Sequence, residues 1–294
     1  MLFVLLLGQV SLMAQKDYAL LPKPQQMEVK GGNFLLNQVK LNTPVLEAEW
    51  KALVAELGGR VNDKATQTIE VKLVPSIEGA ELNLEEAYRL TVTGKGITVE
   101  ATTETGAYWA MQTLRQLAVK KGGQSLVKNC RIVDWPAFKM RGFMQDVGRS
   151  YISMDELKRE IDMLSRYKIN IFHWHLTENQ AWRLQSKIFP MLNDAENMTR
   201  MPGKYYTLEE AKELVEYCKK RQVLLIPEID MPGHSAAFKR TFRHDMQSPE
   251  GMKILKLLVD EVCETFDVPY LHIGTDEVGF SNPTFVPEMV AYIR

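Results

Sequence analysis

The chain has 294 residues, 45% of them hydrophobic and 25% charged, which is typical of an ordinary globular protein. Its 36 Lys and Arg residues nearly balance 37 Asp and Glu residues, so the net charge of −1 does not indicate nucleic acid or an anionic membrane as a partner. The three cysteines, Cys130, Cys218 and Cys263, lack metal-ligand spacing, and their odd number argues against a disulfide framework. We expect three buried thiols.

The N-terminus is an apolar run from Leu2 to Met13 that ends at Ala14-Gln15. It is too short to span a bilayer comfortably and is typical of the core of a secretory signal with a small residue at the cut. No basic residue precedes the run, so either the true start lies upstream or the signal is weak. The alternative, a buried strand, is disfavoured because polar residues 15–17 break the pattern abruptly. We predict a signal peptide over residues 1–15 and export to the periplasm or the extracellular space, with no membrane anchor.

Residues 16–137 are predicted to form a small α/β domain. Pro22 and Pro24 open it, residues 71–74 have a strand pattern, and Gly94 to Gly96 turn a hairpin between residues 88–93 and 97–101. A helix is predicted over residues 107–119, beginning after Thr105-Gly106 and followed by Gly122-Gly123.

From Met140 onward, strand and helix patterns alternate. Strand-like runs cover residues 142–147, 169–176, 223–229 and 270–276, and helix patterns cover 155–167, 208–221 and 252–266, with a further helix beginning at Pro287. Ser153 with Glu156, and Thr207 with Glu210, have the spacing of a capping box. A repeated strand–helix order requires a parallel sheet with right-handed crossovers.

Residues 138–294 are therefore predicted to form the first half of a (β/α)8 TIM barrel, about four βα units in an α/β fold. A closed barrel needs roughly 250 residues, and only about 155 follow Met140. The structural alternative is a complete doubly wound sheet of four or five strands. The half-barrel is favoured because polar residues gather at the C-terminal end of every strand, as they do in barrel enzymes.

The fourth of these runs ends in two adjacent carboxylates, Asp276 and Glu277. On a strand, His272, Gly274 and Asp276 would point to one face, and Glu277 would lie at the end over the same pocket. Two acids held together repel, which raises one pKa and keeps that group protonated, and a protonated acid beside an ionised one is suited to cleaving a glycosidic bond. The alternative for an isolated pair is that Asp276 caps the next helix and Glu277 is solvated.

Other strand ends carry polar residues too. Arg149 follows the first strand, where it could donate to adjacent sugar hydroxyls with Asp146 orienting it, although a plain surface arginine is the alternative. The third strand ends near Asp230, and the turn at Pro232-Gly233 holds His234 at the rim. Four successive strand ends with an acid, an arginine or a histidine predict a functional site.

The second strand places His173 and His175 on one face. Two histidines at this spacing can bind a metal, so a metal-dependent barrel hydrolase is a competing hypothesis. The alternative is a pair of core histidines hydrogen-bonded to inward carboxylates. We prefer it for His173 because the five histidines of the chain include no further cluster that completes a zinc set.

These segments resemble glycoside hydrolase family 20, the β-N-acetylhexosaminidases, over nearly everything after the apolar N-terminus. The resemblance rests on the order and the strand-end placement of its motifs, which are Gly106-Ala107-Tyr108-Trp109, Gln112-Thr113-Leu114, Arg141-Gly142 through Asp146 and Arg149, His173-Trp174-His175-Leu176-Thr177, Pro227-Glu228-Ile229-Asp230-Met231-Pro232-Gly233-His234, and His272-Ile273-Gly274-Thr275-Asp276-Glu277.

The resemblance implies a retaining hydrolysis in which the 2-acetamido oxygen of the substrate attacks the anomeric carbon and forms an oxazolinium intermediate, an exception to the two-carboxylate scheme. It implies that Glu277 is the general acid, which later acts as general base, and that Asp276 orients the acetamido group. Glu178 and His234 match a supporting pair that tunes the acid. The substrate-binding residues implied in this way are Arg149, Glu178, His234 and Asp230.

The chain departs from the family pattern at two places. Thr275 stands where the family usually has a second glycine before the acid pair, and Glu178-Asn179 stands in place of Asp-Asp. We expect these changes to alter specificity or rate. The family's acetamido-pocket tryptophans and tyrosine belong to the second half of the barrel and have no match here, so we expect an N-terminal portion whose site is incomplete.

We therefore expect an exported exo-β-N-acetylhexosaminidase that acts on glycans or glycoconjugates with a terminal N-acetylhexosamine and requires no metal or cofactor. Three alternatives remain: release of a disaccharide, as by a lacto-N-biosidase; a catalytically inactive glycan-binding protein; and a metal-dependent amidohydrolase that uses His173 and His175.

Overall fold

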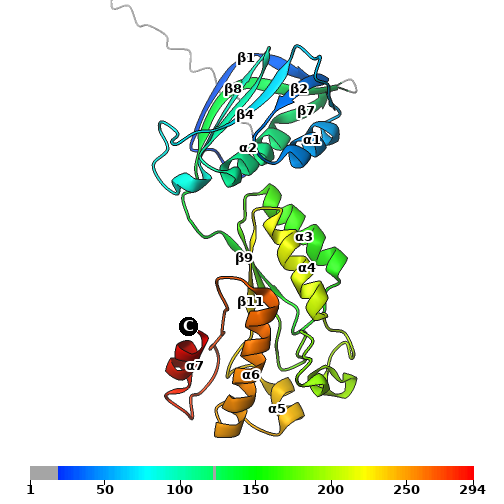
Figure 1. Ribbon diagram of the computed structural model, residues 1–294, viewed down its shortest axis with the longest axis vertical. Coiled ribbons are helices and arrows are strands. Elements are labelled where there is room, and N and C mark those ends of the chain that lie inside the picture. The colour runs from blue at the N-terminus through cyan, green and yellow to red at the C-terminus, as the bar shows by residue number, and fades with distance from the viewer. Residues whose placement is uncertain (1–18, 122–123) are drawn as a thin grey trace, which may run out of the picture. The chain divides into compact units, whose positions relative to one another are not determined.

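The computed structural model describes residues 19–121 and 124–294, and the chain divides into two compact units between Ala137 and Phe138 (Figure 1). The expected signal peptide, residues 1–15, and the expected Gly122-Gly123 break lie outside the described residues. Within the described part of the chain, no helix combines the length and apolar character needed to cross a membrane.

The first unit is built on a mixed sheet in the order β1-β8-β5-β6-β4-β2-β3, with β7 paired to β8. Helices α1 (Glu47–Glu56) and α2 (Glu104–Leu117) lie on one face of this sheet, as Figure 1 shows. The strands are β1 (Gln26–Leu36), β2 (Gln38–Asn42), β3 (Arg60–Val61), β4 (Thr68–Leu73), β5 (Tyr88–Thr93), β6 (Gly96–Ala101), β7 (Ala118–Lys121) and β8 (Gln124–Asp134). A short 3₁₀ turn, η1 (Leu84–Glu86), precedes β5.

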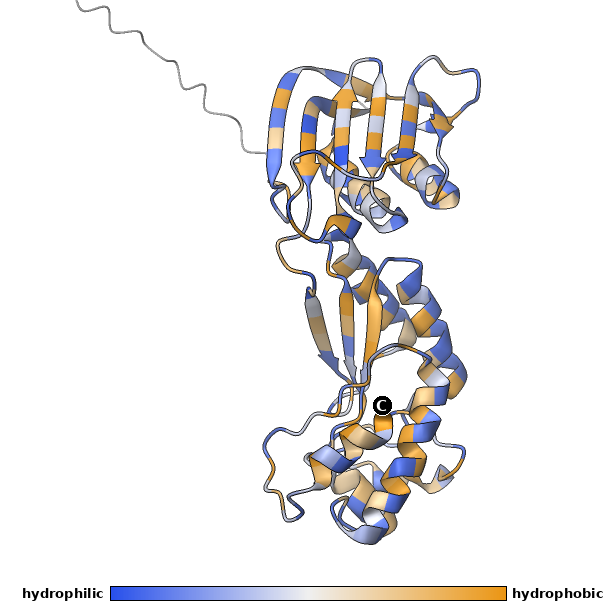
Figure 2. Ribbon diagram, turned by 60° about the vertical axis from the view of Figure 1, so that its left-hand side comes forward, coloured by the Kyte–Doolittle hydropathy of each residue, from blue (hydrophilic) through white to orange (hydrophobic). Residues whose placement is uncertain are grey.

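Alternating hydrophobic residues hold this unit together. Along β6, Ile97, Val99 and Ala101 are fully buried while their neighbours are partly exposed, and Figure 2 shows the same banding along the strands of the sheet. The expected hairpin is confirmed, since β5 pairs antiparallel with β6. Helix α2 begins earlier than predicted because Thr103 caps it, accepting hydrogen bonds from the backbone N–H groups of residues 105 and 106, and Val119 belongs to β7 rather than to the helix.

The second unit is an open sheet of three parallel strands in the order β11-β10-β9, each followed by helical segments. The strand order lacks the reversal of a doubly wound sheet, and on the inward face of β9 Met144 is half exposed. The arrangement is that of an incomplete barrel. Its elements are β9 (Gly142–Asp146), α3 (Met154–Arg166), β10 (Ile171–His175), η2 (Pro190–Asn193), η3 (Ala195–Asn197), α4 (Leu208–Lys219), β11 (Leu224–Glu228), α5 (Ala236–Phe242), α6 (Pro249–Phe266) and α7 (Phe285–Ile293).

Local sequence signals explain where these helices begin. Both predicted capping boxes form: the Ser153 hydroxyl accepts from the Glu156 N–H while the Glu156 carboxylate accepts from the Ser153 N–H, and Thr207 and Glu210 repeat the pattern. The outer face of the sheet, with Phe172 and Trp174 fully buried, shares one hydrophobic core with the helices. The predicted orientation of the second strand is therefore confirmed.

Two expectations are wrong. Residues 270–276 do not form a strand; His272 alone makes a parallel bridge, to Glu228, because the backbone then turns left-handed at Gly274 (φ 64°) and Thr275 (φ 87°) and cannot stay extended. The alternation rule therefore does not orient the acid pair. Cys263 is exposed rather than buried, because it lies on the outward side of α6, whereas Cys130 and Cys218 are buried as expected; all three are free thiols.

Candidate active site

A row of polar side chains crosses the C-terminal end of the parallel sheet. In register, Asp146 of β9 lies beside His175 of β10, and His175 lies beside Glu228 of β11. The bridge from Glu228 to His272 extends the row to a fourth segment. Residues paired in register point to the same face, so four distant parts of the sequence present polar groups to one place.

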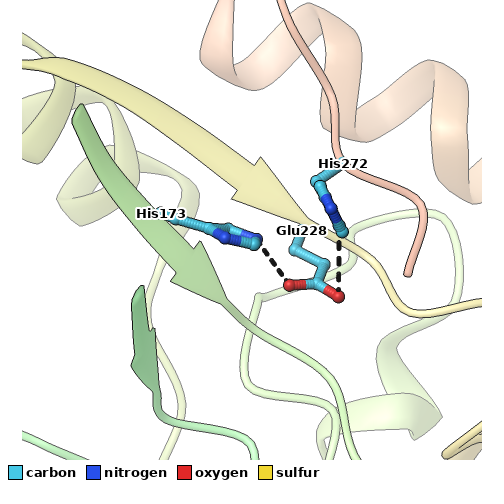
Figure 3. Close-up of side chains that lie close together, drawn as sticks. All are labelled: His173, Glu228 and His272. Carbon is cyan, nitrogen blue, oxygen red and sulfur yellow. Dashed lines mark ion pairs between the residues drawn. The ribbon is translucent and has the colours of Figure 1, made fainter. Parts of the chain in front are cut away.

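Glu228 is buried and lies at the centre of a cluster of three histidines, two of which, His173 and His272, are drawn with it in Figure 3. Its Oε2 lies 2.5 Å from Nε2 of His173 and 3.0 Å from Nδ1 of His175, and its Oε1 lies 3.3 Å from Nδ1 of His272. Burial by itself raises the pKa of Glu228, but the three histidine contacts outweigh it and lower that pKa well below its usual range. Glu228 is therefore an anion held inside the protein.

The same contacts act on the histidines. Burial lowers the pKa of His175, and its bond to Glu228 reverses this and raises the pKa overall. The bond to Glu228 also raises the pKa of His272. His173 and His175 both contact Glu228, as expected of a core pair beside an inward carboxylate. A carboxylate can accept hydrogen bonds from imidazoles, but Nε2 of His173 and Nε2 of His175 are among the buried atoms of the described residues that have no hydrogen-bond partner.

Arg149 lies between two carboxylates. Its Nη1 is 2.6 Å from Oδ2 of Asp146, as the sequence suggested, and its Nη2 forms an ion pair with Glu178. The bond to Asp146 raises the pKa of Arg149. The Arg149 side chain is half exposed, whereas Glu178 is only 1% exposed, so one end of this pair is fixed in the protein and the other is open to a ligand.

His234 links Glu178 to the acid pair. Its Nδ1 lies 2.8 Å from Oε1 of Glu178, and its Nε2 lies 3.4 Å from Oε2 of Glu277 and 3.9 Å from Oδ2 of Asp276. His234 is mostly buried, while the side chains of Asp276 and Glu277 are 68% and 76% exposed. The predicted Glu178–His234 pair and the acid pair are therefore neighbours in space.

Asp230 supports the turn that carries the acids. The backbone N–H of Thr275 donates to its Oδ1 at 3.2 Å. A Cβ on Gly274 would lie 1.9 Å from the same oxygen, so only glycine fits there. Burial raises the pKa of Asp230, which the bond from Thr275 opposes. Asp230 is also tied to the neighbouring strand end, because its backbone N–H donates to the Thr177 hydroxyl at 3.0 Å.

The structure thus gathers all six predicted site residues, and two that sequence reasoning assigned no role, Glu228 and His272. Parity along β11 was the available signal for Glu228, since it lies two residues before Asp230 and in register with His175. Asp230, His234 and Asp276 offer atoms within 4.8 Å of one another, a spacing that a small cation could share. Their contacts with Thr275 and Glu178 already give Asp230 and His234 partners within the protein.

Comparison with known proteins gives a consistent picture for both units. Residues 17–135 match the family described as glycosyl hydrolase family 20, domain 2, and residues 138–245 match glycosyl hydrolase family 20, catalytic domain. A beta-hexosaminidase of Vibrio furnissii is 33% identical, over 88% of this chain and 49% of its own length. A beta-N-acetylhexosaminidase of Cellulomonas fimi is 30% identical, over 94% of this chain and 63% of its own length.

Solved structures agree with these sequence matches. The beta-N-acetylhexosaminidase of Bacteroides fragilis superposes with a TM-score of 0.77 at 28% identity, over 94% of this chain and 60% of that one. A family 20 exo-beta-N-acetylglucosaminidase of Vibrio harveyi, solved in complex with N-acetylglucosamine, gives a TM-score of 0.76 at 27% identity, over 94% and 50% of the two chains. This chain spans between 39% and 49% of the length of the first three curated relatives that it matches.

Proposed function

The chain belongs to glycosyl hydrolase family 20, and we propose that it hydrolyses terminal β-linked N-acetylglucosamine or N-acetylgalactosamine from glycans. Family membership supports a glycoside hydrolase. The names of its relatives, and the N-acetylglucosamine bound to the Vibrio harveyi enzyme, support an N-acetylhexosamine as the sugar recognised. The choice between the two sugars and the linkage are part of the proposal.

The observation that carries the proposal is the contact of His234 with Glu178 on one side and Glu277 on the other. A buried anion fixes one ring nitrogen, so the ring presents its second nitrogen to the exposed acid. A histidine held in this way can exchange a proton with Glu277 and set its charge during a reaction. Arg149, fixed by Asp146 and Glu178, is placed to donate to sugar hydroxyls.

We propose a substrate-assisted reaction at this site. Glu277 gives its proton to the glycosidic oxygen as the bond from that oxygen to the anomeric carbon breaks. The acetamido oxygen of the same sugar forms a bond to the anomeric carbon, which gives the oxazolinium ion, and the Asp276 carboxylate stabilises the positive charge. Water, losing its proton to Glu277, then attacks the same carbon and restores the acetamido group with retention. An intramolecular nucleophile gains from its high effective concentration.

The test compares, in the full-length protein, hydrolysis of an aryl β-N-acetylglucosaminide with hydrolysis of the matching aryl β-glucoside. We expect the acetamido sugar to be hydrolysed at least about 100-fold faster, because only it carries the internal nucleophile. Glu277→Gln should lower that rate by about 10²- to 10⁴-fold, the usual range for loss of a general acid. Equal rates on the two substrates would overturn the mechanism.

The same assay separates the alternatives. A protein that hydrolyses neither substrate but binds N-acetylglucosamine, with the same affinity in the parent and in Glu277→Gln, would be a glycan-binding protein. Loss of the rate on addition of a chelator would favour the metal-dependent alternative. Release of an intact disaccharide from an aryl lacto-N-bioside, with no action on the monosaccharide substrate, would favour the lacto-N-biosidase alternative.

We also propose that the protein is exported, on the ground of the apolar run that ends at Ala14. N-terminal sequencing of protein recovered from the cell exterior or periplasm should find a chain beginning close to Gln15. Recovery of the intact N-terminus from the cytoplasm alone would contradict export.

A further inference from the structure

The Nδ1 atom of His272 has two possible hydrogen-bond partners, and they require opposite protonation states of this atom. The Gly274 N–H donates to this atom at 3.1 Å, which requires a lone pair on Nδ1. Oε1 of Glu228 lies 3.3 Å from the same atom, and a hydrogen bond there requires a proton on Nδ1. One ring nitrogen cannot be donor and acceptor at once. The presence of a proton therefore decides which bond His272 makes.

Gly274 opens the turn that carries the acid pair. The turn has left-handed backbone at Gly274, Thr275 and Glu277 (φ 64°, 87° and 48°), and a side-chain carboxylate, that of Asp230, accepts from its Thr275 N–H. The bond from the Gly274 N–H to His272 is the second hydrogen bond from the backbone of the turn to a side chain. Its loss would leave the Thr275 bond to Asp230, together with the contacts of His234 with the Asp276 and Glu277 side chains.

The Glu228 carboxylate is held in place beside His272. It is almost fully buried, and His173 and His175 hold its other oxygen. The backbone N–H of His272 donates to the Pro227 carbonyl at 2.9 Å, which keeps the ring beside the carboxylate. The charged and titratable groups that face His272 are Glu228, Asp230, His175 and His173, whose ring centroid lies 4.5 Å from that of His272 with the two rings tilted by 49°.

We propose that Glu228 and His272 are positioning residues for the acid pair. With Nδ1 unprotonated, His272 accepts from Gly274 and closes the turn. A proton on Nδ1 transfers the hydrogen bond to Glu228 and releases the Gly274 amide. Both residues act through the backbone that places Asp276 and Glu277. The importance of this positioning for catalysis rests on the proposed function; the proton-dependent exchange of bonds does not.

The deciding experiment is a pH titration of the ¹⁵N-labelled chain by NMR, which follows the Gly274 amide and the His272 ring nitrogens. In the parent chain, the amide should move with the same midpoint as the ring. Glu228→Gln should lower that midpoint by about one pH unit or more, because an opposite charge that close stabilises the protonated ring. Glu264→Gln, the same substitution at an exposed position on α6, should leave it unchanged.

A second variant keeps the test decisive if Glu228→Gln does not fold. His272→Asn supplies an oxygen that accepts from Gly274 and carries no titratable proton, so the amide should stay at its high-pH position across the range. The proposal would be overturned if the chemical shift of the Gly274 amide did not follow the titration of His272. It would also be overturned if that shift still changed with pH in His272→Asn. A midpoint left unchanged by Glu228→Gln would do the same.

The kinetic consequence is measured separately. The acid limb of the pH–rate profile should shift to lower pH in Glu228→Gln. Without the carboxylate, His272 takes up its proton at lower pH, so its hydrogen bond from Gly274 persists to more acidic conditions. If the chain hydrolyses no N-acetylhexosaminide, the proposed function fails, and the NMR titration still decides whether the bonds exchange. If the profile does not move while the NMR midpoint does, the exchange exists but does not position the acids, which overturns the positioning role.

Discussion

Nδ1 of His234 lies 2.8 Å from Oε1 of Glu178, a carboxylate that is only 1% exposed. The same carboxylate forms an ion pair with Arg149, so one buried anion organises both a predicted sugar-binding cation and the histidine that faces the acid pair. The substitution of glutamate for the usual family aspartate has kept this charge within reach of both partners.

Glu178→Gln should therefore reduce hydrolysis by about 10²-fold, within the range for lost support of acid–base catalysis. The amide keeps the shape of the side chain but removes the charge that Arg149 and His234 share. The measurement is kcat/KM on the aryl β-N-acetylglucosaminide, with Glu264→Gln as the matched exposed control. A rate equal to that of the control would contradict a functional role for Glu178.

The decrease in the free energy of unfolding caused by Glu228→Gln should depend on pH. The pKa values of His175 and His272 are raised in the folded chain, so their stabilisation is complete below about pH 6.5, the usual histidine value, and is lost as pH rises through the folded values. The pKa of Glu228 is depressed, so its contribution is present above about pH 4.3 and is lost only as pH falls through its lower folded value.

Both contributions are present together near pH 5.5. Urea unfolding of the parent chain and of Glu228→Gln should therefore show a larger difference at pH 5.5 than at pH 8.5. A difference that is constant across this range would mean that Glu228 does not stabilise protonated histidines.

Thr275→Gly should stabilise the chain by about 1 kcal/mol. A β-branched residue at φ 87° is strained by roughly 1–3 kcal/mol, and glycine removes this strain at an entropic cost of about 0.5–1 kcal/mol. Thr66, an exposed threonine outside the positive-φ region, gives the matched control: Thr66→Gly should be slightly destabilising. Equal effects of the two substitutions in thermal unfolding would contradict strain at Thr275.

Gly233→Ala should reduce activity by at least about 10-fold, since small displacements of catalytic groups are costly. A Cβ at this position would lie 2.7 Å from the Asp276 carbonyl oxygen, so the backbone of the acid pair would have to move. Gly279→Ala is the control, because its Cβ would meet no atom within 4 Å. Unchanged kinetics in Gly233→Ala, with the fold intact by circular dichroism, would argue against close placement of this backbone.

Much of the second unit could be predicted from local pattern. The capping boxes at Ser153 and Thr207 formed because each needs only residues three apart. Strand β10 was predictable because alternation separated its histidines from Phe172 and Trp174. The segment at 270–276 was not, because its apolar pattern resembles a strand while its backbone is turned at Gly274 and Thr275 to meet Asp230 and His272.

The sequence by itself determined the strands β9, β10 and β11 with their parallel order, the capped starts of α3 and α4, and the identity of the acidic, basic and histidine residues near the strand ends. Periodicity and capping are local, so they can be read along the chain. Only the tertiary structure decided that Glu228 collects three histidines and that Glu178 holds both Arg149 and His234. These contacts join segments far apart in the chain, and their distances depend on strand register and on turns whose geometry no local pattern specifies.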